Sequence, residues 1–155
     1  MSGTPKSRPS PELALTIQHG IGAAKPPSRA RFGKWIRAAL TRSARITLRV
    51  VGAREARLLN HRFRRRDYAT NVLTFVYSAA RPLEGDIAIC APVVAREARA
   101  LGISLDAHYA HLTVHGVLHL RGYDHQRVPD AERMERLETR ILKKLGYADP
   151  YQNAE

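Results

Sequence analysis

The sequence predicts a single α+β domain, built as a four-stranded mixed sheet with packed helices. The chain has 155 residues, a length that suits one domain and can bury a core. Four short apolar stretches have the character of strands, and five longer stretches repeat apolar residues at helical spacing. Residues 1–11, rich in Ser and Pro, predict a disordered basic tail, which leaves residues 12–155 as the domain.

The first part of this domain is expected to hold two strands and a helix. Residues 13–18 predict a strand, and the glycines and prolines of 19–27 predict a loop. Ser28 is a suitable N-cap for a helix whose apolar residues, up to Leu40, recur at helical spacing. Alternating apolar and polar residues over 45–51 predict a half-buried strand.

The middle of the chain alternates between the two kinds of element. A helix is predicted over 53–63, followed by two apolar strands over 72–77 and 85–90. A proline opens the next predicted helix, over 92–100, and a longer helix is predicted over 105–120.

The final helix is predicted to begin at Pro129, with acidic residues in its first turn and Gly146 after its end. Its apolar stripe consists of Met134, Leu137, Ile141 and Leu145. These features predict a structural helix that contributes to the core and not to a functional site.

Three histidines near the end of the 105–120 helix are the strongest functional signal. His115 and His119 are four residues apart, so a helix places both on one face. Gly122 suits the left-handed backbone that ends a helix, after which the chain can return with His125. Three neutral imidazoles with an open fourth position are typical of a catalytic zinc site. The spacing therefore predicts one Zn²⁺, or a similar divalent transition metal, bound by His115, His119 and His125.

The same histidine spacing occurs in a class of zinc peptidases. Those enzymes need a glutamate general base directly after the first histidine, and here that residue is Gly116. The ligand spacing is thus kept without the proteolytic base, which argues against a peptidase.

The histidine segment, His-Gly-Val-Leu-His-Leu-Arg-Gly-Tyr-Asp-His at 115–125, resembles the signature of the YbeY family of bacterial metal-dependent endoribonucleases. Residues 60–75, with Asn-His-Arg-Phe-Arg followed by Thr-Asn-Val-Leu-Thr-Phe, are similar to a second family pattern. Gly-Asp-Ile at 85–87 and Leu-Gly-Tyr-Ala-Asp-Pro-Tyr at 145–151 also match, so the resemblance covers roughly residues 45–151. Thr74 stands where the family usually has Ser, and Val76 where it often has Pro.

The resemblance implies a zincin-like metal-binding helix and a metal-dependent, single-strand-specific endoribonuclease. It places this activity in 16S rRNA 3′-end maturation and ribosome quality control, with single-stranded RNA or rRNA and the ribosome or its small subunit as partners. It also singles out Arg64 as the catalytic arginine of the cluster Arg62, Arg64, Arg65 and Arg66. The guanidinium fork of an arginine suits contact with phosphate.

The net charge of +12 is unevenly distributed along the chain. Residues 1–66 contain 16 Lys and Arg against 2 acidic residues, whereas residues 67–155 contain 10 against 12. Such asymmetry is expected of a protein that binds nucleic acid, although positive charge alone identifies no ligand.

The remaining composition excludes several classes of protein. The single cysteine, Cys90, excludes an internal disulfide and is interpreted as a core residue. No apolar stretch is long enough to span a membrane, and residues 1–12 lack the apolar core of a secretory signal. We therefore expect a cytoplasmic protein without a membrane partner. The sequence assigns no oligomeric state.

Several alternatives stay open at this stage. His111 either supports the metal ligands or has a purely structural role, and Asp124 either orients a ligand or forms a turn. For the whole protein, the rival functions are a zinc metallopeptidase and a non-catalytic, zinc-stabilised ribosome assembly factor.

Overall fold

The computed structural model describes residues 11–20, 22–64, 70–80, 82–124 and 126–152, with only the backbone at 63 and 64. In chain order its elements are β1 (Leu13–His19), α1 (Arg29–Ala39), β2 (Ala44–Val51), α2 (Ala53–Arg64), β3 (Val72–Ser78), β4 (Leu83–Cys90), α3 (Ala91–Leu101), α4 (Leu105–Leu120) and α5 (Val128–Lys144). Every predicted strand and helix is present. The fourth strand begins before its predicted start at Gly85, because Leu83 and Glu84 already pair with β2. The predicted tail over 1–11 lies almost wholly outside the described residues.

The four strands form one mixed sheet in the order β1-β2-β4-β3. β1 runs parallel to β2 and β2 runs parallel to β4, whereas β3 is antiparallel to β4. The predicted α+β class with a four-stranded mixed sheet is therefore confirmed.

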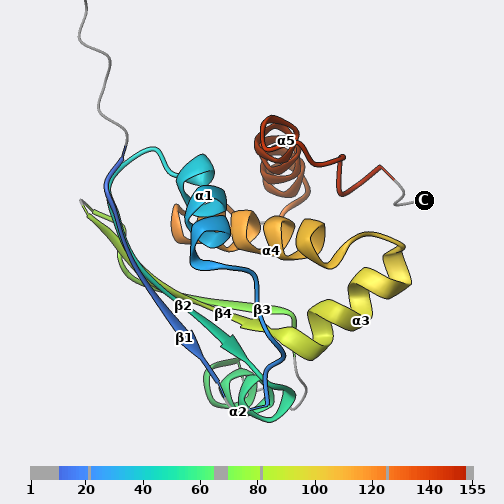
Figure 1. Cartoon of the computed structure of the whole chain (residues 1–155). Helices are drawn as coiled ribbons and strands as arrows, with labels where there is room; N and C mark the ends of the chain where they lie inside the picture. Colours follow the sequence, from blue (N-terminus) through green and yellow to red (C-terminus); the bar gives the residue numbers. More distant parts are fainter. Residues whose placement is uncertain (1–10, 21, 65–69, 81, 125, 153–155) are drawn as a thin grey trace, which may run out of the picture.

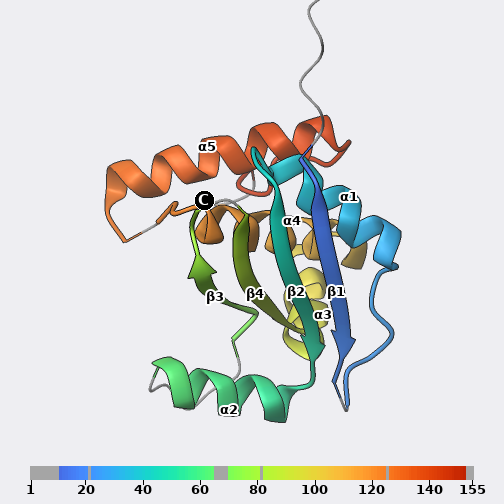
Figure 2. The same cartoon turned by 90° about the vertical axis from the view of Figure 1, so that its left-hand side faces the viewer.

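The helices are arranged in layers on one side of this sheet (Figure 1). α4 lies between the sheet and α5, and it contacts α1, α3, α5, β3 and β4. α2 lies across the end of the sheet that is farther from α5. None of the other described helices covers the face of the sheet that is turned to the viewer in Figure 2. No helix in the described part of the chain is both long and apolar enough to cross a membrane.

The main core lies between the sheet and the helix layer. Phe32 and Trp35 of α1 are almost fully buried and meet edge to face, with ring centroids 5.6 Å apart. Trp35 is therefore a residue of the core. Cys90, as predicted, is buried, in a smaller cluster with Val51, Ala56 and Val93.

Local sequence fixes the ends of the helix that carries the histidines. The Ser104 hydroxyl accepts a hydrogen bond from the backbone N–H of Ala107 at 3.0 Å, which caps the start of α4. At the other end Gly122 has a φ of 102°, a conformation that side chains other than glycine rarely adopt. The N–H of Tyr123 then bonds the carbonyl of Leu118 at 3.0 Å and turns the chain back. The predicted role of Gly122 is confirmed.

Candidate metal centre

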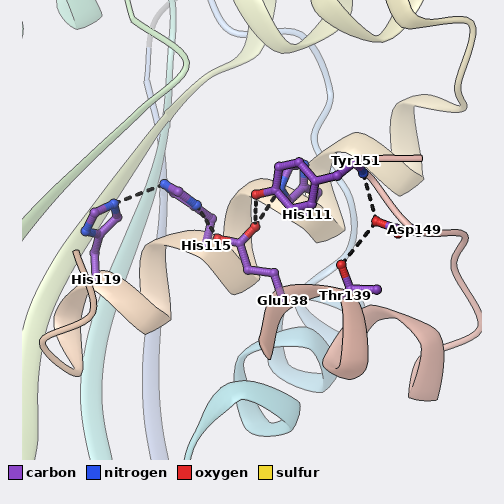
Figure 3. Close-up of polar contacts among 7 residues, drawn as sticks. All are labelled: His111, His115, His119, Glu138, Thr139, Asp149 and Tyr151. Atoms are coloured by element: carbon purple, nitrogen blue, oxygen red, sulfur yellow. Dashed lines mark hydrogen bonds and ion pairs between the residues drawn. The ribbon is translucent and has the colours of Figure 1, made fainter. Parts of the chain in front are cut away.

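Of the four histidines in α4, three follow one another at intervals of four residues: His111, His115 and His119. This spacing places them in a row along one face of the helix, and Figure 3 shows the rings in that order. The face is not turned to bulk solvent, since the side chains of His111 and His115 are only 17% and 20% exposed.

The two predicted ligands on this helix are brought together. The Nε2 atom of His115 lies 3.0 Å from the Nε2 atom of His119, and the two rings meet nearly at right angles. Two nitrogens bound to one tetrahedral zinc at 2.0–2.1 Å would be about 3.3 Å apart. A hydrogen bond between the two nitrogens would also account for this distance, so it alone does not identify a metal site.

Glu138 of α5 decides how the His115 ring is oriented. Its Oε1 atom lies 2.5 Å from Nδ1 of His115, on the side of the ring opposite His119. An ionised carboxylate only accepts hydrogen bonds, so Nδ1 must donate the proton. In the neutral ring this leaves the lone pair on Nε2, the atom that faces His119. Metal-binding histidines are commonly held by a carboxylate in this way.

Further side chains hold Glu138 itself. His111 Nε2 donates to its Oε2 at 2.9 Å, and the hydroxyl of Tyr151 donates a short hydrogen bond to the same oxygen. Tyr151 is positioned in turn through its backbone N–H, which donates to Asp149 Oδ1 at 2.9 Å, and Thr139 donates to that oxygen at 3.1 Å. Figure 3 shows this chain of contacts running from His119 to Thr139.

The carboxylate of Glu138 is fully buried and ionised. Burial would raise its pKa, but the hydrogen bonds from His111 and His115 outweigh this effect and lower the pKa to about 2. Burial and the neighbouring charge of Glu138 raise the pKa of Tyr151, which keeps its hydroxyl a donor. A negative charge is therefore fixed directly behind the His115 ring.

Two sets of side chains could hold a metal ion here. His111, His115 and Glu138 form a group whose possible ligand atoms all lie within 4.8 Å of one another. In that group, however, the carboxylate already accepts hydrogen bonds from three side chains. The pair His115 and His119 is the better match to a zinc site, because Glu138 directs the Nε2 lone pair of His115 toward His119.

The side chains of two predicted site residues, His125 and Arg64, are not described. The place of His125 as the third ligand therefore stays a prediction. Arg64 is the last residue of α2. Asp124 accepts a hydrogen bond from the N–H of Gln126 at 3.2 Å, which agrees with the turn interpretation and leaves room for a further contact.

Glu138 is the residue that sequence reasoning missed, and the prediction that the last helix is only structural was wrong. A signal for it exists: Glu138 lies four residues after Met134 and three before Ile141, both of which are buried. A carboxylate within an apolar stripe must find partners, because a buried unpaired charge is strongly unfavourable. The histidines of the preceding helix supply them.

Comparison with known proteins assigns the chain to a family. The model of the family "Endoribonuclease YbeY" matches residues 25–146. The Endoribonuclease YbeY of Nitrosospira multiformis is 53% identical over 96% of this chain and 89% of its own length. The protein of the same name from Aromatoleum aromaticum is 54% identical over 92% of this chain and 94% of its own length.

A solved structure supports the fold. The solution structure of a Thermotoga maritima protein superposes with a TM-score of 0.53 and 21% sequence identity, covering 89% of this chain and all of that one. The arrangement of sheet and helices is thus shared well beyond close relatives. Since the family model covers most of the chain and these two relatives are more than half identical, the protein belongs to the Endoribonuclease YbeY family.

Proposed function

We propose that this protein hydrolyses phosphodiester bonds of single-stranded RNA, using one zinc ion held by His115, His119 and His125. Its place would be in 16S rRNA 3′-end maturation and ribosome quality control, in the cytoplasm and in contact with the small subunit. The observation that carries the proposal is the imidazole pair of His115 and His119, 3.0 Å apart, with a buried carboxylate behind it. Membership of an endoribonuclease family supports RNA as the substrate.

Glu138, His111, Tyr151 and Arg64 would each have a role in this reaction. A divalent ion bound here supplies Lewis-acid polarisation of a phosphoryl oxygen and lowers the pKa of water. Glu138 holds the proton of His115 on Nδ1, so that Nε2 is the binding atom. His111 and Tyr151 fix Glu138, and Arg64 offsets the negative charge that develops on the phosphate in the transition state.

The peptidase alternative is not supported. An added Cβ at Gly116 would meet Cγ2 of Ile87 at 3.2 Å and Cγ2 of Thr74 at 3.4 Å. This position faces the sheet, so a glutamate there would have to displace core side chains before it could act as a base. The glutamate that a peptidase would use as its base is absent, and the side chains of Ile87 and Thr74 occupy the space beside Gly116.

One cleavage assay tests the proposal against both rivals. A labelled single-stranded RNA, the same RNA as a duplex, and an unstructured peptide are each incubated with the purified protein. We expect cleavage of the single strand alone, lost on chelation and restored by zinc. The variant with His115, His119 and His125 all changed to alanine should lose both activity and the bound metal equivalent. His19→Ala, which removes an exposed histidine at the end of β1, is the matched control.

Each contrary result identifies a different error. Cleavage of the peptide would revive the metallopeptidase. RNA binding without cleavage, in metal-loaded protein, would favour the assembly factor. A folded triple variant that retains a full equivalent of zinc would remove these histidines as the ligands.

A further inference from the structure

A cavity of about 520 Å³ lies beside the connection between α4 and α5. Its wall comes from three parts of the chain: the turn between α1 and β2, the residues that follow α4, and the first turns of α5. The charged residues among its lining are Arg42, Arg121, Asp124, Asp130 and Arg133. We call this cavity the arginine pocket.

Arg42 enters the pocket with an unsatisfied donor. Its Nε atom is buried and has no hydrogen-bond partner among the described residues. A buried N–H without a partner costs free energy, and a guanidinium N–H favours a charged oxygen as acceptor. Arg42 therefore contributes to the pocket wall a guanidinium with one donor that no described group satisfies.

Arg121 is held rigidly in the same wall. Its Nη1 donates to the carbonyl of Ala39 at 2.8 Å, and its guanidinium carbon lies 5.3 Å from the centre of the Tyr123 ring. Arg42 and Arg121 line the same pocket, so two guanidinium groups are available to an anion bound there.

Among the described residues, neither Asp124 nor Asp130 forms an ion pair with Arg42, Arg121 or Arg133. Asp124 accepts a hydrogen bond from a backbone N–H of its own turn. The pocket has three arginines against two aspartates, so it keeps an excess of positive charge.

The pocket is next to the candidate metal centre along the chain. Arg121 and Asp124, which line it, belong to the segment that joins His119 to His125. RNA drawn to the metal would carry its neighbouring phosphates past this segment. A forked guanidinium pair in a cavity of this size suits a phosphate group.

We propose that the arginine pocket binds a backbone phosphate of the RNA substrate, at a linkage other than the one that is cleaved. This inference rests on the proposed function, because it takes RNA as the substrate. The pocket would set how the strand crosses the metal centre and so which linkage is presented for cleavage.

The test measures binding of a labelled single-stranded RNA to the full chain loaded with zinc, with strand integrity checked after each titration. Arg42→Ala and Arg133→Ala remove pocket arginines, and Arg99→Ala removes an exposed arginine of α3 as the matched control. We expect each pocket variant to weaken binding about tenfold, as for a lost charge-assisted hydrogen bond. The salt dependence of binding should fall by about 0.7 in slope, the value for one phosphate of a single strand. Thermal unfolding and zinc content of every variant show whether its fold and metal site are retained.

A second series locates the phosphate. RNA oligomers that each carry one uncharged methylphosphonate linkage, moved stepwise along the strand, are bound to the wild-type protein and to Arg42→Ala. At one linkage the substitution should weaken wild-type binding and leave Arg42→Ala unaffected, which identifies the phosphate that the pocket holds. Equal losses in both proteins at every linkage would overturn the proposal.

The remaining outcomes separate the pocket from the function. If the protein binds no single-stranded RNA at all, the proposed function fails first. If it binds RNA but Arg42→Ala and Arg133→Ala behave like Arg99→Ala, the pocket assignment is wrong and the function stands. If inorganic phosphate raises the melting temperature of the wild type but not of Arg42→Ala, while their RNA affinities agree, the pocket takes free phosphate and the RNA assignment is wrong.

Discussion

Glu138 accepts hydrogen bonds from His111, His115 and Tyr151. None of these partners belongs to α5, the helix that carries Glu138: the histidines lie in α4, and Tyr151 follows the end of α5. The result is an orientation of the His115 ring that does not depend on a bound metal. A carboxylate behind a metal-binding histidine fixes the tautomer and makes the imidazole a better ligand. The charge on Glu138 therefore matters more than the volume of its side chain.

Replacing Glu138 with Gln tests this point, because it removes the charge and nearly keeps the shape. Zinc affinity, measured by competition with a coloured chelator, should fall about 10- to 100-fold, as for other residues that support a metal ligand. Glu135→Gln, at an exposed position of the same helix, is the control and should bind zinc like the wild type. Equal affinities in the two variants would mean that Glu138 has only a structural role.

Arg64 is the second residue whose role is open to direct measurement. If it stabilises charge that develops only in the transition state, Arg64→Ala should lower the cleavage rate by about 10²–10³ and weaken RNA binding far less. Arg64→Lys keeps the charge without the fork and should not restore the full rate. Arg65→Ala serves as the comparison, and equally small rate losses at both positions would make Arg64 an ordinary phosphate contact.

At the scale of elements, helices and strands could be predicted from periodicity and end signals, but their partners could not. The limits of α4 follow from Ser104 and Gly122, because capping and left-handed turns depend on neighbours in sequence. The contact between Glu138 and His115 joins two helices, and the helical pattern of α5 does not specify which histidine faces it. Likewise the parallel pairing of β2 with β4 is set by packing across the sheet, which local pattern does not encode.

The close approach of α4 to the sheet gives a prediction about two glycines. An added Cβ at Gly85 would lie 2.8 Å from the backbone oxygen of Phe75 and 2.6 Å from Cδ2 of Leu120, and the backbone oxygen has little room to move. Gly85→Ala should therefore destabilise the protein by about 1–3 kcal/mol. At Gly116 the contacts start at 3.2 Å and involve only side chains, and alanine gains about 1 kcal/mol in helix propensity. Urea unfolding should show Gly116→Ala as clearly the milder change, and the reverse order would contradict this account of the packing.

At the scale of the whole molecule, part of the basic excess is already compensated within the fold. Arg31 pairs with Asp106, Arg45 with Glu84, and Arg49 with Glu55. The first two pairs join the basic first part of the chain to the acidic second part. Most of the positive charge stays available for a polyanion, since the net charge is +12.

This excess predicts how RNA binding responds to salt. The logarithm of the affinity should fall linearly with the logarithm of salt concentration, by about 0.7 for each phosphate neutralised on a single strand. Fluorescence anisotropy at a series of salt concentrations measures the slope, and an oligomer with a neutral backbone is the control. A slope near zero for the charged RNA would show that the basic half of the chain does not contact it.

The burial of α4 between the sheet and α5 also has a consequence for motion. Backbone amides exchange with solvent when the structure around them opens, and elements packed on all sides open only with the whole domain. The middle of α4 should therefore be among the slowest-exchanging parts of the protein. His115 is carried by α4, and His119 lies in its last turn, which the hydrogen bond from Tyr123 N–H to the Leu118 carbonyl closes. Their separation should therefore be maintained for as long as this part of the domain stays folded, so that local fluctuations do not have to reassemble the pair before each turnover.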